Sequence, residues 1–496
     1  MFVKENYFLT LGDKHRGVEQ LVARRAHNPK VAGSSPVPTT SKSRFCKRRL
    51  LCLSRFTLVS SSFLPISLFA EKVRNEKSHI LLKFFKAAVN YDCLAFSVTA
   101  TLMILIFFSS PLVAEELLCG IDRLEASHCR ELSGLRVALV TNAAGVTGKG
   151  EPNYAMMIRN GVKLKFLMAP EHGFSMTVEA GKAVGTAIAT DTLPVFSLYG
   201  TSKKPDIGQL RKIDLLIFDL QDIGTRCYTY ISTMKNAMEA CEQAGTAFMV
   251  LDRPNPIAAL GQSGFVLQEG YESFVGAVEI PFVHAMTVGE IAVQLKKQHY
   301  PGLDLQVIPL QGYHRNSFAD EYQGFHFRSP SPNIKDVDTA IVYPVTVFLE
   351  ATTVSEGRGT DAPFQQFGAP FIRSNKLLEA LTKYHLAGVV LEQVSFIPHS
   401  SKFKGERCEG LIIKVTNRRA FAPFETATAL LLELQRLYPE DIGLDKRGRF
   451  FDQLAGSHLF RQMIKRQSSL ESIMEASRQQ IKVFARDSAA QSSLYP

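Results

Sequence analysis

The sequence predicts an α/β protein: a Rossmann-like, mainly parallel sheet with helices on both faces, followed by a smaller α+β domain. From Arg136 onward, short apolar runs alternate with helical patterns, as in βαβ units. The runs are continuously apolar rather than alternating, which is typical of strands covered on both faces. After Pro344 this alternation stops, which predicts that a different domain begins in this region.

In the first part of the chain we expect strands at residues 137–140, 164–168, 195–198, 215–218 and 248–251. Residues 228–243 carry apolar side chains at helical spacing and are followed by Gly245, which predicts a crossover helix packed on the sheet. Thr287 and Glu290 have the spacing of a capping box, so a further helix is expected over residues 287–298.

In the second part, strands are expected at 388–396 and 411–415, and helices at 425–437 and 470–484. The Pro-rich segment from Ser329 to Asn333 is interpreted as a boundary loop, with a cleft wall as the alternative. The predicted domains are therefore a Rossmann-like catalytic domain at residues 115–335 and an α+β domain at residues 336–496, which completes the cleft.

Residues 1–114 are expected to be a leader outside the folded protein. Residues 17–36 resemble the translation of a transfer-RNA gene, which indicates a start codon placed too far upstream. An apolar run at 102–108, small residues up to Ala114 and the acidic pair that follows are typical of a signal peptide at about residues 95–114. An uncleaved anchor is the alternative. We expect an exported protein, periplasmic or secreted, with no stable membrane insertion after cleavage.

The net charge of +10 comes from this leader. Residues 1–114 contain 17 of the 57 basic and 6 of the 47 acidic residues, which leaves 40 basic and 41 acidic residues in the remainder. A neutral body without a basic stripe argues against nucleic acid as a partner.

Five cysteines follow Ala114, and none forms a CxxC pair. This number and spacing predict neither a disulfide framework nor a zinc site. Cys119 and Cys129 could pair, and the others are expected to be buried thiols.

Glu171 and His172 follow an expected strand that ends at Pro170. Open α/β sheets bind their ligands at the carboxyl ends of the strands, so a carboxylate and an imidazole here are candidate catalytic groups. The alternative is a solvated loop charge or a first-turn helix residue.

Two further strand ends carry polar clusters. The first, residues 218–230, contains carboxylates, an amide, an arginine and tyrosines that suit a polar ligand with an apolar ring face; the alternative is that Asp222 caps the helix and pairs with Arg226. The second contains Asp252, Arg253 and Asn255. Polar clusters at three strand ends favour a functional site.

The loop at residues 354–361, preceded by Glu350, adds carboxylates from the second domain, although Gly and charge also characterise an exposed turn. Glycine fingerprints of nucleotide sites, the zinc-protease motif and the serine-hydrolase elbow are all missing from the sequence. A carboxylate-rich site without a cofactor fits hydrolysis at a sugar.

Taken together and in order, the motifs resemble the NamZ family of exo-β-N-acetylmuramidases. They run from about Gly120 to the C-terminus and comprise the segments 140–142, 169–174, 197–200, 218–233, 251–256, 286–290, 329–333 and 355–360. The resemblance implies a Rossmann-like domain, a smaller C-terminal domain, and release of N-acetylmuramic acid from the non-reducing end of peptidoglycan fragments. We expect neither a metal nor a cofactor, because the sequence lacks their usual motifs.

The resemblance, applied position by position, and the strand-end argument together predict catalytic residues and substrate-binding residues. The expected catalytic residues are Glu171, His172, Asp222 and Glu356. The expected substrate-binding residues are Asn142, Asp219, Gln221, Arg226, Tyr228, Tyr230, Asp252, Arg253, Asn255 and Arg358.

The mechanism stays open between a pair of protein carboxylates and participation of the substrate's acetamido group. Arg226, Arg253 and Arg358 are equal candidates for the lactyl carboxylate of the sugar. The chain departs from the family pattern at Ala143-Ala144, at Ala285 and at residues 351–353, changes that bear on substrate preference. The competing hypothesis is a non-catalytic exported protein that binds cell-wall sugars in the same cleft.

Overall fold

The computed structural model describes residues 116–179, 181–182, 185, 187–190, 193–200, 202–488 and 494–495. The expected leader and signal peptide, residues 1–114, lie outside these residues. Within the part that is described, no helix has both the length and the apolar character needed to cross a membrane.

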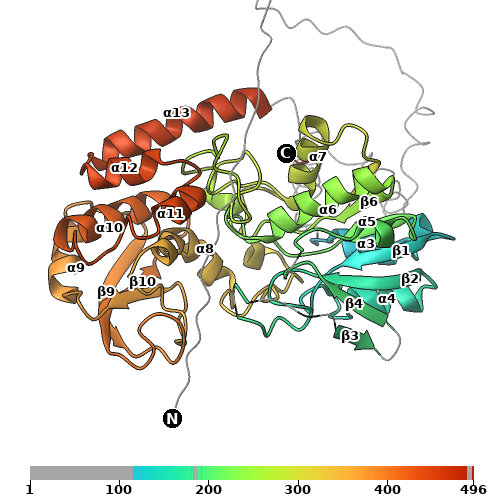
Figure 1. The fold of residues 1–496 in the computed structure, drawn as a ribbon, viewed down its shortest axis with the longest axis horizontal. Coiled ribbons are helices and arrows are strands. Elements are labelled where there is room, and N and C mark those ends of the chain that lie inside the picture. Colours follow the sequence, from blue (N-terminus) through green and yellow to red (C-terminus); the bar gives the residue numbers. More distant parts are fainter. Residues whose placement is uncertain are drawn as a thin grey trace, which may run out of the picture. The chain divides into compact units, whose positions relative to one another are not determined.

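The larger domain is built on a seven-stranded sheet (Figure 1). Its order is β3-β4-β2-β1-β5-β6-β7, and every neighbouring pair is parallel except β3 with β4. The strands are β1 (Arg136–Val140), β2 (Lys163–Ala169), β3 (Ala187–Thr190), β4 (Leu193–Ser197), β5 (Leu215–Phe218), β6 (Ala247–Leu251) and β7 (Leu305–Ile308). The direction of winding changes between β1 and β5, as in doubly wound folds. This confirms the Rossmann-like prediction.

Alternate residues of each strand point to opposite faces, and both faces are covered. On β1, Ala138 and Val140 pack toward one buried cluster, whereas Val137 and Leu139 pack toward the other. The first face is covered by α5 (Ile207–Leu210), α6 (Tyr230–Ala244) and α7 (Val288–Gln298), the second by α3 (Gly120–Ala126) and α4 (Asn153–Arg159). Continuous burial explains why these strands read as unbroken apolar runs.

Both helices expected in this domain are present with their end signals. Helix α6 ends at Gly245, whose φ of 71° lies in the left-handed region that glycine adopts without strain. Helix α7 begins after Thr287, which shares a capping box with Glu290. Strand β7 was not predicted, because its residues are only partly buried at the sheet edge and include Gln306.

The smaller domain contains a three-stranded antiparallel sheet of order β8-β10-β9. Its strands are β8 (Gln366–Ala369), β9 (Val389–Phe396) and β10 (Cys408–Val415). Its helices are α8 (Val337–Thr346), α9 (Ser374–Thr382), α10 (Pro423–Leu437), α11 (Gly448–Ala455), α12 (Leu459–Lys465) and α13 (Leu470–Ser488). Short 3₁₀ helices lie at Arg130–Leu132, Ala258–Leu260, Ala319–Glu321 and Val347–Ala351. The smaller α+β domain is thus confirmed.

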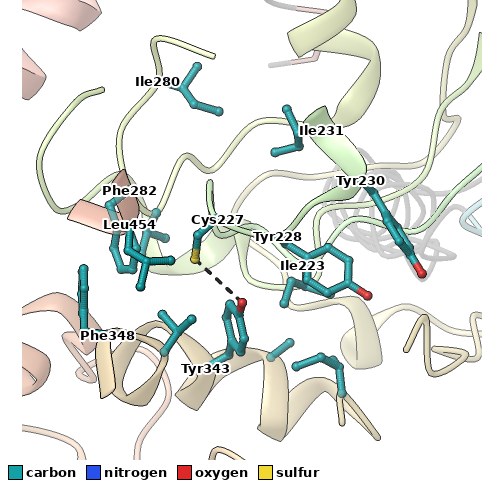
Figure 2. Close-up of a cluster of buried hydrophobic side chains, with 14 of the residues drawn as sticks. Ile223, Cys227, Tyr228, Tyr230, Ile231, Ile280, Phe282, Tyr343, Phe348 and Leu454 are labelled. Carbon is teal, nitrogen blue, oxygen red and sulfur yellow. Dashed lines mark hydrogen bonds between the residues drawn. The ribbon is translucent and has the colours of Figure 1, made fainter. Parts of the chain in front are cut away.

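A buried cluster joins the two domains (Figure 2). Phe282 stacks on Phe348 with ring centroids 4.4 Å apart. Cys227 lies against Tyr343 of α8, with 3.8 Å between its Sγ and the phenolic oxygen. The Cys227 contact holds the loop after β5 against the second domain, and the Phe282 contact holds the segment before α7 there.

All five cysteines of the described residues are buried free thiols. The pairing of Cys119 with Cys129 considered from the sequence is therefore wrong. Cys129 lies next to the Met156 sulfur instead, at 3.7 Å.

Candidate active site

A cleft of about 1010 Å³ lies between the loops at the carboxyl edge of the large sheet and the smaller domain. Its volume is at the upper end of the range for small-molecule sites, about 300–1,000 Å³. The Pro-rich segment expected as a boundary loop or a cleft wall contributes Ser331, Pro332 and Asn333 to the lining. This supports the cleft-wall interpretation.

Glu171 follows β2 and lies buried in the cleft lining, with 6% of its surface exposed. Both carboxylate oxygens are held: Oε2 accepts a 2.7 Å hydrogen bond from the Thr229 hydroxyl, and Oε1 accepts one of 2.9 Å from the Gly181 amide. Burial, followed by the negative charge of Glu171, raises the pKa of Tyr199 to about 12. The carboxylate therefore has a fixed orientation beside a protonated phenol.

His172 is buried next to Glu171 and has a φ of 74°. Its Nδ1 donates a 2.8 Å hydrogen bond to the carbonyl oxygen of Val178, which leaves Nε2 as the acceptor of the neutral ring. Burial lowers the pKa of the imidazole below its ordinary value. His172 thus presents an uncharged base in the cleft.

The smaller domain supplies the opposite wall, where Arg358 bridges two carboxylates. Its Nη2 lies 2.6 Å from Oε1 of Glu350, and its Nε lies 3.2 Å from Oε1 of Glu356. Lys402 binds the second oxygen of Glu356 at 3.0 Å. Glu356 is 3% exposed and Glu350 is 20% exposed, so Glu350 is the more accessible of the two.

The two walls interact electrostatically. The charges of Glu171, Arg358 and Glu350 all act on the pKa of His172, although burial has the largest effect. Charged groups of both domains therefore act on the same imidazole.

Tyr228 also lines the cleft and contacts the Tyr230 ring edge to face, with centroids 4.8 Å apart. Its buried hydroxyl makes no hydrogen bond of normal geometry with the residues that the structure describes. Tyr228 thus contributes an aromatic ring to the cleft lining.

No group of three or more His, Cys, Asp or Glu side chains in the described ranges has the arrangement of a metal site. Glu350 and Glu356 of the cleft are instead paired with Arg358 and Lys402.

The chain is similar to proteins of a known family. Residues 137–338 match the family model "Exo-beta-N-acetylmuramidase NamZ, N-terminal", and residues 341–495 match the corresponding C-terminal model. The chain belongs to the NamZ family. It is 41% identical over 369 residues to "Peptidoglycan beta-N-acetylmuramidase NamZ" of Bacillus subtilis strain 168, covering 74% of this chain and 89% of that protein.

Two solved structures, both of DUF1343 family proteins from Bacteroides fragilis, share the NamZ-type fold of this chain. The first is 32% identical with a TM-score of 0.70 and covers 77% of this chain and 99% of its own. The second is 26% identical with a TM-score of 0.60 and covers 75% and 97%, respectively.

The structure divides the expected site residues of this NamZ chain into two groups. The cleft lining contains Glu171, His172, Tyr228, Glu356 and Arg358. The lining does not include Asn142, Asp219, Gln221, Asp222, Arg226, Tyr230, Asp252, Arg253 or Asn255. The geometry gives most of this second group partners within the protein.

Asp219 and Arg253 form a buried ion pair with two contacts, 2.6 Å from Nε to Oδ1 and 3.0 Å from Nη2 to Oδ2. Asn153 donates a further 2.7 Å hydrogen bond to Asp219. Arg253 and Gln221 line a separate small cavity of about 30 Å³. This pair holds the ends of β5 and β6 together.

The alternative to a ligand-binding role considered from the sequence was that Asp222 pairs with Arg226. The structure does not contain this pair. Oδ2 of Asp222 accepts a 2.7 Å hydrogen bond from the Gly224 amide and lies 3.2 Å from Nε2 of His284. Arg226 donates to the carbonyl oxygens of three residues, at 2.6 Å, 2.8 Å and 3.0 Å, namely Phe265, Ile280 and Leu454. Burial lowers the pKa of Arg226 to about 10.

The other members of the second group also bind their surroundings. Asp252 accepts hydrogen bonds from the Gly289 amide and the Thr287 hydroxyl at the start of α7. Asn255 donates to the Met286 carbonyl oxygen at 2.9 Å. The two remaining residues, Asn142 and Tyr230, both donate to the Pro330 carbonyl oxygen.

Several cleft residues were not selected from the sequence. Tyr199 and Thr229 lie within the motifs noted above, Tyr199 in segment 197–200 and Thr229 in segment 218–230. Lys402 lies in a loop without a motif, and only the fold brings its amine to Glu356. Of the departures from the family pattern, Ala285 takes a φ of 52°, which explains why glycine is expected there.

Proposed function

We propose that this chain is an exo-acting glycoside hydrolase that releases N-acetylmuramic acid from the non-reducing end of peptidoglycan fragments, in cell-wall turnover or recycling. The observation that carries the proposal is the cleft of a NamZ-family protein in which Glu171 is buried and held by two donors, opposite carboxylates of the smaller domain. The Bacillus subtilis relative is named a peptidoglycan beta-N-acetylmuramidase.

Two chemical routes fit the geometry. In the first, Glu171 and a carboxylate of the opposite wall share the work of protonating the leaving oxygen and activating water or stabilising the positive sugar centre. Glu350 suits the second position better than Glu356, because Glu356 is bound by both Arg358 and Lys402. In the second route, the substrate's acetamido group takes the place of that carboxylate.

His172 supports either route as a neutral base. Because Nδ1 is committed to Val178, only Nε2 can accept a proton or a hydrogen bond from the substrate or water. Its position next to Glu171 in the sequence fixes both groups on one loop.

The test is hydrolysis of para-nitrophenyl β-N-acetylmuramide by the purified protein and by Glu171→Gln. The substitution keeps the size of the side chain and removes its acid–base function, so kcat should fall by about 10²- to 10⁴-fold, with binding of the glycoside retained. The matched control is Glu179→Gln. Glu179 also lines the cleft, but it is exposed, whereas Glu171 is buried.

Unchanged turnover by Glu171→Gln would contradict the assignment of this residue. If the unaltered protein binds several muramyl glycosides but hydrolyses none, the chain is a cell-wall-sugar binding protein instead.

We also propose that the protein is exported and that its mature form begins at Glu115. The support is the sequence pattern at residues 95–114, an apolar run followed by small residues and an acidic pair. N-terminal sequencing of protein recovered from the periplasm or medium tests this. Recovery with an intact leader in the membrane fraction would contradict it.

A further inference from the structure

The muramyl sugar carries an anionic group that a muramidase has to accommodate, the lactyl carboxylate. Carboxylates in proteins are bound by cations through charge-assisted hydrogen bonds. Among the described residues, the cleft lining contains five lysine and arginine side chains: Lys203, Lys335, Arg358, Lys402 and Arg447.

Four of these cations are already engaged. Arg358 and Lys402 are paired with the carboxylates of the opposite wall. Lys335 donates to the Asp361 carbonyl oxygen at 2.7 Å. Arg447 donates to the Glu350 carbonyl oxygen at 2.8 Å.

Lys203 differs from them in its surroundings. Its ammonium lies 4.1 Å from the ring centroid of Phe274 and 5.0 Å from that of Tyr199. The two rings contact each other at 5.5 Å between centroids, tilted by 46°. Within the described part of the chain, the structure gives this ammonium no carboxylate or carbonyl partner, whereas the adjacent Lys204 pairs with Glu239 at 2.5 Å.

Aromatic faces attract a cation without neutralising its charge. Phe274 and Tyr199 therefore restrict the position of the ammonium while leaving its N–H groups available to an anion. The same rings offer a surface on which an apolar sugar face can stack.

Lys203 is also connected to the catalytic centre. Tyr199, one of the two rings beneath its ammonium, interacts through its hydroxyl with Glu171. Lys203, Tyr199 and Glu171 all line the same cleft.

We infer that Lys203, positioned over Phe274 and Tyr199, binds the lactyl carboxylate of the muramyl sugar and is a specificity-determining residue. This inference rests on the proposed function. It replaces the three arginines considered from the sequence, since Arg226 and Arg253 lie outside the cleft lining and Arg358 is paired with two carboxylates.

The experiment compares two substrates, para-nitrophenyl β-N-acetylmuramide and the same glycoside with the lactyl acid converted to a neutral amide. Because Lys203 is exposed, the unaltered protein should prefer the acid by about two- to fivefold in kcat/KM, the size of an ion pair with an exposed side chain. Lys203→Met should lose this preference through a higher KM for the acid, with kcat/KM for the amide unchanged. Lys203→Arg should retain most of the preference.

Lys204→Met is the matched control. Lys204 is the next residue in the sequence and carries the same charge, but its side chain pairs with Glu239 and does not line the cleft. It should hydrolyse both glycosides as the unaltered protein does. If Lys203→Met lowers kcat/KM equally for the acid and the amide, or for neither, the inference is wrong.

Calorimetric binding of N-acetylmuramic acid and its lactyl amide gives a readout that needs no turnover. If the unaltered protein binds the acid selectively and Lys203→Met does not, the inference is supported even when no glycoside is hydrolysed. Absence of hydrolysis would contradict only the proposed activity. Hydrolysis of muramides with equal binding of acid and amide would overturn the inference and keep the proposed function.

Discussion

The hydroxyl of Thr229 donates a 2.7 Å hydrogen bond to Oε2 of Glu171, which joins the loop after β2 to the residue that precedes α6. Thr229 stands at the N-cap position of this helix, yet its side chain does not cap the helix. The hydroxyl is therefore committed to the carboxylate rather than to the backbone.

Because its hydroxyl caps nothing, Thr229 can be replaced without loss of a helix cap. Thr229→Val keeps the shape and removes the donor, so Glu171 loses one of the two donors that orient it. We expect kcat to fall by about tenfold, the value of one oriented hydrogen bond to a charged group. Thr229→Ser restores the donor and should recover most of the rate. Equal rates for the Val and Ser variants would show that the contact has no role in turnover.

Arg226 is expected to act on stability rather than on turnover. Its guanidinium is buried and satisfies three carbonyl oxygens from both domains. Arg226→Met leaves these oxygens without a donor, and we expect a loss of about 3–5 kcal/mol in the free energy of unfolding, as for a broken buried polar network. Urea unfolding measures this loss, and kcat is compared at a temperature where the variant is folded. A large loss of kcat with an unchanged free energy of unfolding would show that Arg226 acts in the substrate site.

The two glutamates of the opposite wall should respond differently to the same change. Glu350 is the more exposed of the two carboxylates and is therefore more accessible to the substrate. We expect Glu350→Gln to cause the larger loss of kcat. Glu356→Gln removes the charge between Arg358 and Lys402, so we expect the larger loss of thermal stability there. Parallel measurements of kcat and melting temperature separate the two roles. The reverse order would make Glu356 the better candidate for the second carboxylate.

The strand ends show what the sequence could predict and where it stopped. Apolar runs fixed the positions of the strands, and the residues after them were correctly expected at the sheet edge. Which of these polar residues line a cleft depends on partners elsewhere in the chain. Asp219 forms an ion pair with Arg253, and Asp252 accepts a hydrogen bond from the Thr287 hydroxyl. These carboxylates therefore stabilise the fold and do not line the cleft.

The opposite wall was harder to predict, because its members meet only in the folded chain. Lys402 reaches Glu356 from 46 residues away in the sequence. Lys203 and Phe274 are likewise separated by a complete strand–helix–strand unit, and no local pattern relates them. Periodicity detects burial along one element, whereas a cleft is made of side chains from several.

Ala285 offers a test of stability away from the chemistry. It is buried with a φ of 52°, a left-handed conformation that strains a residue with a Cβ atom. We expect Ala285→Gly to raise the free energy of unfolding by about 1 kcal/mol. Ala285→Val, with a branched Cβ, should lower it. The two variants are compared by urea unfolding, and destabilisation by glycine would mean that lost chain entropy outweighs the strain.

His172 allows a pH prediction. Burial lowers the pKa of His172 in the folded chain, whereas in the unfolded chain its pKa is about 6.5. As the pH falls through about 6.5, the unfolded chain binds a proton that the folded chain does not, so the free energy of unfolding decreases. His172→Asn removes this contribution and should weaken the decrease between about pH 7 and pH 5.

Asparagine is the appropriate substitute because it tolerates the positive φ of His172, and its amide can replace Nδ1 as the donor to Val178. The variant keeps the loop but lacks Nε2, so kcat should fall while the fold is retained. Urea unfolding at several pH values is measured for both proteins. Parallel curves would show that the folded chain does not hold this imidazole neutral, and an unchanged kcat would show that Nε2 takes no part in the reaction.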